Sequence, residues 1–280
     1  MDYPFPVFLA VLGAAALHAT WNAFVRGGAN PLLHMAALTI WTGILGLPVA
    51  LALPLPDSAS WLWMALSVAI HIIYYVTLSQ AYQHGSLSVM YPIMRGGAPL
   101  LVSIGSVLFI GESMSIAGWA GVLLVSTGVL AIAMRSGLDQ PRIAITWALA
   151  CSVSIASYSI VDGQGARLSQ NPLAFTAWLY VAESVAFTGL LVLAGQAKPL
   201  VRYMTDRFWT CAIGGLMSAV AYAIVLWAMS RAPMALVSAT RETSVLFAAL
   251  IGVWVLKERF SARQWAGALL LVGGLLALRL

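Results

Sequence analysis

Two stretches of this sequence, GESMSIAGWAGVLLVSTGVLAIAM (residues 111–134) and KERFSARQWAGALLLVGGLLALRL (residues 257–280), lie 146 positions apart and match at a series of positions. Each has a glutamate at its second position, a serine three residues later, a Trp-Ala-Gly triplet, and another glycine seven residues beyond the glycine of that triplet. The same shift places Arg95 on Arg241. This ordered set of matches predicts that the second half of the chain repeats the first.

Apolar segments long enough to cross a bilayer recur along the whole chain. Of the 280 residues, 61% are hydrophobic and 8% are charged, whereas about a quarter of the residues in an average soluble domain are charged. A helix rises about 1.5 Å per residue, so about 20 apolar residues span a hydrocarbon layer of about 30 Å. The sequence therefore predicts ten membrane-spanning helices, at residues 5–25, 32–53, 61–83, 88–110, 115–134, 143–162, 172–194, 209–229, 234–256 and 262–279.

The predicted spans divide into two halves, residues 1–137 and 138–280, with five spans each. Because five is odd, the second half must enter the membrane from the side opposite to the first, so the repeats are inverted. Inverted repeats around a site near the midplane are the architecture of alternating-access secondary transporters. We therefore expect an all-α polytopic membrane protein with ten transmembrane helices, in two inverted five-helix repeats around a central cavity.

The repeated motif also resembles a known family. The pattern Glu-x-x-Ser-x-x-x-Trp-Ala-Gly that begins at Glu112, and its copy from Glu258, is similar to the end of the repeat in the EamA-like family of the drug/metabolite transporter superfamily. The resemblance covers essentially the whole chain. It implies a cavity lined mainly by spans 1, 3, 4, 6, 8 and 9, spans 5 and 10 packed at the pseudo-twofold axis, and the export of metabolites.

Two arginines, Arg95 and Arg241, lie inside predicted spans, whereas the other twelve Lys and Arg residues lie in loops or at span ends. A cation at the bilayer centre costs about 2.5–3.5 kcal/mol, so each should face a wet cavity or an acidic partner. Guanidinium groups donate paired hydrogen bonds that fit a carboxylate or phosphonate. In the alternative interpretation, buried acids neutralise the arginines and lock the helices together. The candidate acids, which could also carry a coupling proton, are Asp162, Glu183 and Glu242.

The segment around Arg95, MYPIMRGGAP (residues 90–99), contains two prolines and two glycines. Proline lacks an amide donor, and interrupted helices are typical of transporter binding sites. We therefore expect this helix to bend or break near Arg95, and Arg95 to contact substrate more directly than Arg241.

Polar and aromatic side chains at helical spacing are expected to line the same cavity. For each aromatic residue the alternative is packing or anchoring at the membrane interface, and for each histidine it is a hydrogen bond within the core. The predicted substrate-binding residues are Trp21, Asn22, His71, Tyr75, Tyr91, Arg95, Tyr158, Tyr222 and Arg241; those predicted for coupling or charge pairing are Asp162, Glu183 and Glu242.

These features predict a secondary transporter of a small anionic or zwitterionic metabolite, such as an amino acid or organic acid. The sequence contains no GxxxxGK[ST] loop, nucleophile motif or metal-ligand spacing, so we expect no catalytic residue, cofactor or metal. The alternative is an intramembrane enzyme that acts on a lipid-linked or small amphipathic substrate. Import and export, and proton coupling and facilitated exchange, are all compatible with the sequence.

The expected location is the cytoplasmic membrane of a bacterium. The predicted partners are the lipid bilayer and a small-molecule substrate, with no nucleic acid, and a monomer suffices because one chain carries both halves. Most loop Lys and Arg residues follow odd-numbered spans, which by the positive-inside rule places both termini outside. The family resemblance instead implies cytoplasmic termini. In both cases the termini share one side.

Overall fold

The computed structural model is helical throughout its described secondary structure. It describes residues 3–25, 30–133, 140–254 and 261–279, without the side chains of residues 21–25, 87–88, 133, 252 and 254. The helices are α1 (Phe5–Val25), α2 (Pro31–Ala52), α3 (Trp61–His84), α4 (Leu87–Gly105), α5 (Ile116–Ala133), α6 (Arg142–Leu168), α7 (Pro172–Leu193), α8 (Ala197–Asp206), α9 (Phe208–Met229), α10 (Met234–Arg241), α11 (Thr243–Trp254) and α12 (Ala262–Ala277), with a 3-10 turn η1 (Ser58–Ser60) and a π turn η2 (Ser106–Ile110).

Every predicted span overlaps a helix, and the ninth span is divided into α10 and α11. Among the described residues, seven helical segments are long and apolar enough to cross a membrane. Three shorter apolar helices cover Phe5–Thr20, Ile116–Ile132 and Ala262–Ala277. The architecture is that of an all-helical, multi-pass membrane protein, and the count of ten spans stays a prediction.

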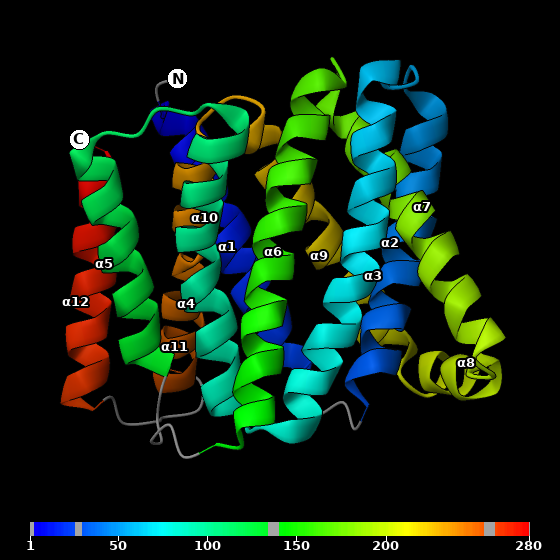
Figure 1. The fold of residues 1–280 in the computed structure, drawn as a ribbon. Helices are drawn as coiled ribbons and strands as arrows, with labels where there is room; N and C mark the ends of the chain where they lie inside the picture. The colour runs from blue at the N-terminus through cyan, green and yellow to red at the C-terminus, as the bar shows by residue number, and fades with distance from the viewer. Residues whose placement is uncertain (1–2, 26–29, 134–139, 255–260, 280) are drawn as a thin grey trace.

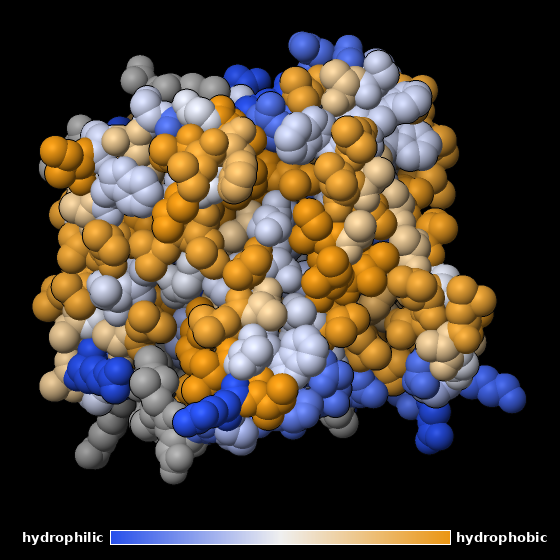
Figure 2. All heavy atoms as spheres, viewed as in Figure 1, coloured by the Kyte–Doolittle hydropathy of each residue, from blue (hydrophilic) through white to orange (hydrophobic). Residues whose placement is uncertain are grey.

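The helices stand side by side in one bundle, with both chain termini at the same end (Figure 1). Apolar residues cover the middle of the visible face, and hydrophilic residues gather toward its two ends (Figure 2). Large apolar side chains on this surface are widely exposed, including Ile116 (90%) and Leu193 (86%). An apolar surface of this extent is suited to lipid rather than water.

Helices α5 and α12 pack through facing glycines. A Cβ atom on Gly121 would lie 2.9 Å from the carbonyl oxygen of Gly274, and one on Gly274 would lie 2.8 Å from that of Gly121. Gly128 and Gly267 approach each other in the same way, at 2.7 and 2.9 Å. The glycines repeated in the two sequence motifs therefore form a close helix–helix contact, in which any side chain would force the backbones apart.

The sequence predicted that helix α4 would bend or break near Arg95; α4 is continuous from Leu87 to Gly105, so it does not break there. Its glycines serve packing instead. A Cβ on Gly96 would lie 2.9 Å from Leu130 Cγ in α5, and a Cβ on Gly97 would lie 2.6 Å from Ser152 Oγ in α6. The missing side chains let α4 sit tightly between these two helices, and this packing keeps the helix intact despite its prolines.

The interruption occurs in the repeat-related ninth span, between α10 and α11. Glu242 lies at the junction, where its amide donates to the carbonyl oxygen of Ala239 (3.1 Å). The hydroxyl of Thr243 donates to the carbonyl oxygen of Thr240 (2.8 Å) and satisfies an acceptor that the break releases. A helix without proline or glycine at this point can therefore break, because hydroxyl side chains replace backbone donors.

Candidate functional site

Arg95, Arg241 and Glu242 form one buried ionic cluster. Arg95 Nε lies 2.9 Å from Glu242 Oε2, and Arg241 Nε lies 3.7 Å from Glu242 Oε1. Their exposed fractions are 8% for Arg95, 6% for Arg241 and 0% for Glu242. One carboxylate therefore serves two guanidinium groups, and one positive charge of this cluster is left over.

The two arginines differ in how well their donors are satisfied. Arg95 makes the closer ion pair with Glu242 and also donates from NH2 to Ser244 Oγ (3.2 Å). Buried nitrogens without an aligned hydrogen-bond acceptor among the described residues are Nε of Arg95 and both Nε and NH2 of Arg241. A buried donor without an acceptor costs about 1–3 kcal/mol. Arg241 thus has one more unsatisfied buried donor atom than Arg95.

The ion pairs differ from those expected from the sequence, and the more direct contact of Arg95 with substrate stays a prediction. Arg95 was expected to be the freer group because its helix was expected to break. Instead, the break in the ninth span lets the Glu242 side chain reach across to α4 and pair with Arg95. Glu183, another of the three candidate acids, pairs with a histidine.

That histidine, His71, belongs to a second buried polar cluster on α3 and α7. His71 Nδ1 lies 3.1 Å from Glu183 Oε1 and 3.1 Å from the carbonyl oxygen of Ser67. The hydroxyl of Tyr75 donates to Glu183 Oε2 (3.3 Å). A short chain of hydrogen-bonding groups thus connects two helices around one carboxylate.

Asp162 and two tyrosines extend this second cluster onto α6 and α9. The hydroxyl of Tyr222 donates to Asp162 Oδ2, and Asp162 Oδ1 has no hydrogen-bond partner among the described residues. The Tyr158 ring stacks on His71, with centroids 4.2 Å apart. Asp162 and Tyr158 both lie within electrostatic reach of Arg241, so the two clusters adjoin.

The charges of the two clusters nearly balance. The described buried residues with ionisable acidic or guanidinium groups are Arg95, Asp162, Glu183, Arg241 and Glu242. Three carboxylates and two guanidinium groups leave one negative charge if all are ionised. A proton on His71 or on one acid removes that charge, and buried charge is costly unless it is balanced. The protonation of these groups and the binding of a further ion are therefore linked.

The other predicted site residues have different positions. Tyr91, on α4, is partly buried and packs against apolar side chains of two clusters. Trp21 and Asn22 lie outside the described side chains. Sequence reasoning did not single out Ser67, although it lies one helical turn before His71. It also did not identify Ser244, which accepts a hydrogen bond from Arg95.

A third ionic contact joins Glu112, which follows η2, to Arg167 near the end of α6. Arg167 NH2 lies 2.5 Å from Glu112 Oε1, and both Glu112 oxygens accept from the amide of Met234 at 3.0 Å. Arg167 also donates to the carbonyl oxygens of Met229 (2.8 Å) and Ala232 (2.9 Å). Glu112 thus caps α10 and ties it to α6. Its counterpart in the repeat, Glu258, lies outside the described residues.

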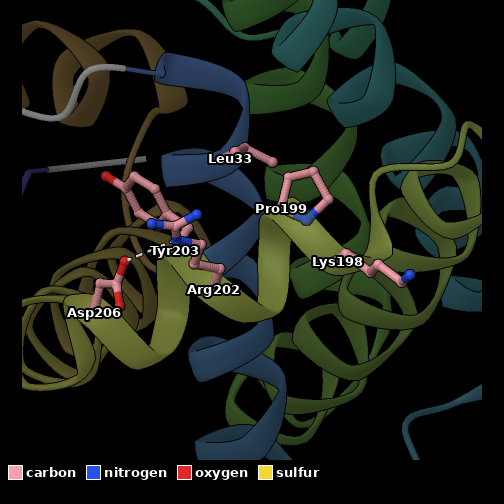
Figure 3. A pocket seen from close by; sticks show the side chains of 6 residues that line it. All are labelled: Leu33, Lys198, Pro199, Arg202, Tyr203 and Asp206. Carbon is pink, nitrogen blue, oxygen red and sulfur yellow. Dashed lines mark ion pairs between the residues drawn. The ribbon is translucent and has the colours of Figure 1, made fainter.

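An open pocket of about 460 Å³ lies on α8, away from the buried clusters (Figure 3). Its lining includes no predicted site residue and consists of Leu33, Lys198, Pro199, Arg202, Tyr203 and Asp206. The described part of the chain contains no group of three or more His, Cys, Asp or Glu residues that could hold a metal ion.

Comparisons with known proteins agree with this architecture. The family model of the EamA-like transporter family matches residues 142–280. A solved structure, titled only "Crystal structure of protein", superposes with a TM-score of 0.75 at 19% identity and covers 98% of each chain. At this identity the likeness shows the fold alone. No curated protein matches the chain in sequence.

Proposed function

Residues 142–280 place this chain in the EamA-like transporter family, and on that premise we propose that it exports a small anionic or zwitterionic metabolite by alternating access. Amino acids and organic acids have the required chemistry. The family is one of membrane transporters, and the chain is an integral multi-pass membrane protein. We place it in the cytoplasmic membrane of a bacterium, where one chain can act as a monomer.

The proposed topology is ten spans in two inverted halves, residues 1–137 and 138–280. The 146-residue repeat of the sequence supports it. So does the direction of the helices, because α1 begins at the end of the bundle that holds the termini and its counterpart α6 begins at the opposite end (Figure 1). The reciprocal glycine contacts of α5 and α12 are also those expected of equivalent helices.

The proposed substrate class rests on one observation, which is that two arginines share the carboxylate of Glu242. The unmatched guanidinium charge favours an anionic group, and the unsatisfied donors of Arg241 suit a carboxylate fork. Neutral and cationic solutes have no negatively charged group that could pair with this guanidinium.

Access to the cluster requires helices to move. Arg95 and Arg241 are each less than one-tenth exposed, so a solute from either face cannot reach them without a change of conformation. Movement of one repeat against the other, around a fixed site, is the general mechanism of transporters with inverted repeats.

We further propose that the His71–Glu183 pair carries a coupling proton. An added anion makes the two clusters more negative, so its binding favours uptake of a proton. Glu183→Gln is then expected to abolish pH-driven accumulation of substrate and to leave exchange of labelled for unlabelled substrate largely intact. Equal pH-driven accumulation by the variant would contradict proton coupling at this pair and favour facilitated exchange.

The substrate class can be tested with purified protein. Metabolites of different charge are first screened for thermal stabilisation, and the hits are then tested for counterflow in proteoliposomes. We expect small carboxylates or zwitterions to stabilise the protein and to exchange without chemical change. Stabilisation by cations alone would contradict the proposed substrate class, and conversion of the hit into a product would contradict transport as the activity.

A further inference from the structure

Helix α8 lies at the end of the bundle opposite the chain termini (Figure 1). It joins α7 to α9 and is anchored by Leu200, which is 3% exposed and packs in an apolar cluster with Leu33 of α2 and Tyr75 of α3. The hydroxyl of Tyr203 lies 3.1 Å from His34 Nδ1. These contacts fix the inner face of α8 against the bundle.

The outer face of α8 combines positive charge with apolar surface. Lys198 and Arg202 are exposed and lie one helical turn apart, where like charges repel each other. Val201, between them in sequence, is 61% exposed. In Figure 2, hydrophilic side chains project at the lower right, below the apolar belt, where α8 lies in Figure 1. A basic amphipathic helix in this position is typical of the membrane interface.

The positive charge on the outer face of α8 is only partly neutralised by acidic side chains of the protein. Arg202 pairs with Asp206 at 3.6 Å, and both side chains are largely exposed. Figure 3 shows Lys198 at the far end of the pocket from Asp206. No acidic partner of Lys198 occurs in the described part of the chain.

Two adjoining hollows meet at these basic residues. The pocket of Figure 3 reaches inward to Leu33, Pro199 and Tyr203. A second hollow of about 370 Å³ is lined by Ala197, Lys198, Val201, Arg202 and Thr205. Lys198 and Arg202 line both hollows, so a negative group placed between them would also have apolar surface beside it.

We infer that α8 and the start of α2 bind the phosphate headgroup of an anionic phospholipid such as phosphatidylglycerol. The phosphate lies between Lys198 and Arg202, and the upper part of the acyl chains contacts Val201. This ligand fits better than a soluble anion because the helix borders the apolar belt and its hollows are partly apolar. The site is separate from the buried arginines and does not depend on the transported solute.

The binding is tested with purified protein by native mass spectrometry and by thermal unfolding, with phosphatidylglycerol or phosphatidylcholine added to the micelles. Each basic side chain near an anionic lipid contributes enough that loss of two weakens binding by roughly an order of magnitude or more. We expect phosphatidylglycerol to bind more tightly and to raise Tm more than phosphatidylcholine does. The double variant Lys198→Ala/Arg202→Ala should lose this preference.

The matched control is Arg142→Ala/Arg263→Ala, which removes the same charge from two other exposed residues. It should keep the preference for phosphatidylglycerol. The inference is overturned if the wild type does not distinguish the two lipids, or if both double variants lose the preference equally. It is also overturned if inorganic phosphate at the same concentration gives the full stabilisation, because the site would then be one for a soluble anion.

Discussion

The two arginine-bearing segments, MYPIMRGGAP (residues 90–99) and LVSATRETSV (residues 236–245), are aligned by the repeat but fold differently. The first carries prolines and glycines and forms a continuous helix, whereas the second carries neither and is interrupted directly after its arginine. In the alignment, Gly96 corresponds to Glu242 and Gly97 to Thr243. The same helical position therefore serves close packing in one half and charge neutralisation in the other.

This difference shows how a repeated scaffold can acquire an asymmetric site. Each half supplies one buried arginine, but one half alone supplies the acid that both arginines share. The Glu242 carboxylate lies closer to the arginine of the other repeat than to its own neighbour. The two arginines thus occupy repeat-related positions but differ in how closely each pairs with Glu242.

The largest expected effect follows from removal of Glu242. Glu242→Gln leaves two buried arginines without a counterion, and breaking a buried ion pair in this way costs about 3–5 kcal/mol. The free energy of unfolding in detergent measures this loss. Adding Arg95→Met to Glu242→Gln should restore part of it, because one of the two unpaired charges is then removed. A double variant less stable than Glu242→Gln would contradict the shared-carboxylate account.

A smaller effect is expected from filling the glycine contact of α4. In Gly96→Ala the added carbon would lie 2.9 Å from Leu130 Cγ and 3.3 Å from the carbonyl oxygen of Ser126. Overpacking of this kind costs about 1–3 kcal/mol. Gly13→Ala is the matched control, because no atom lies within 4 Å of its new carbon. Thermal unfolding should show a lower Tm for Gly96→Ala alone, and an unchanged Tm for both variants would mean that α4 does not need this close contact.

The smallest effect is expected at the contact of Glu112 with Arg167 and the Met234 amide, outside the two compared segments. Glu112→Gln keeps an acceptor for the Met234 amide but loses the charge opposite Arg167, so we expect a loss of about 1–2 kcal/mol in the free energy of unfolding. The exposed pair Arg202–Asp206 is the control, and Asp206→Asn should cost less than about 0.5 kcal/mol. Equal losses in the two variants would show that the Glu112 contact contributes no more than a surface ion pair.

Periodicity and the internal repeat predicted the helical segments well, because apolar length and small-residue spacing are properties that each segment carries by itself. Six of the predicted site residues also converge around His71 and Asp162, since repeat-related positions at similar depth face the same interior. These residues are His71, Tyr75, Tyr158, Asp162, Glu183 and Tyr222.

In contrast, neither the partners of the buried charges nor the position of the helix break could be predicted from the sequence. Proline and glycine around Arg95 indicated a break, but packing against α5 and α6 overrides that local tendency. The partner of each arginine depends on where the Glu242 side chain points, which tertiary structure decides. The α8 pocket was also missed, because its residues come together only when α8 folds back against α2.

The most direct test of the asymmetric anion site compares Arg241→Lys with Arg95→Lys for a ligand found in the metabolite screen. Lysine keeps the charge and removes the planar fork. We expect Arg241→Lys to raise the Kd by roughly 10- to 100-fold, the equivalent of a lost charge-assisted hydrogen bond, and to slow counterflow in proteoliposomes. Arg95→Lys, whose guanidinium already pairs with Glu242, should raise the Kd less. Wild-type affinity and counterflow in Arg241→Lys would contradict the account, because the unsatisfied donors of Arg241 would then have no part in binding the transported anion.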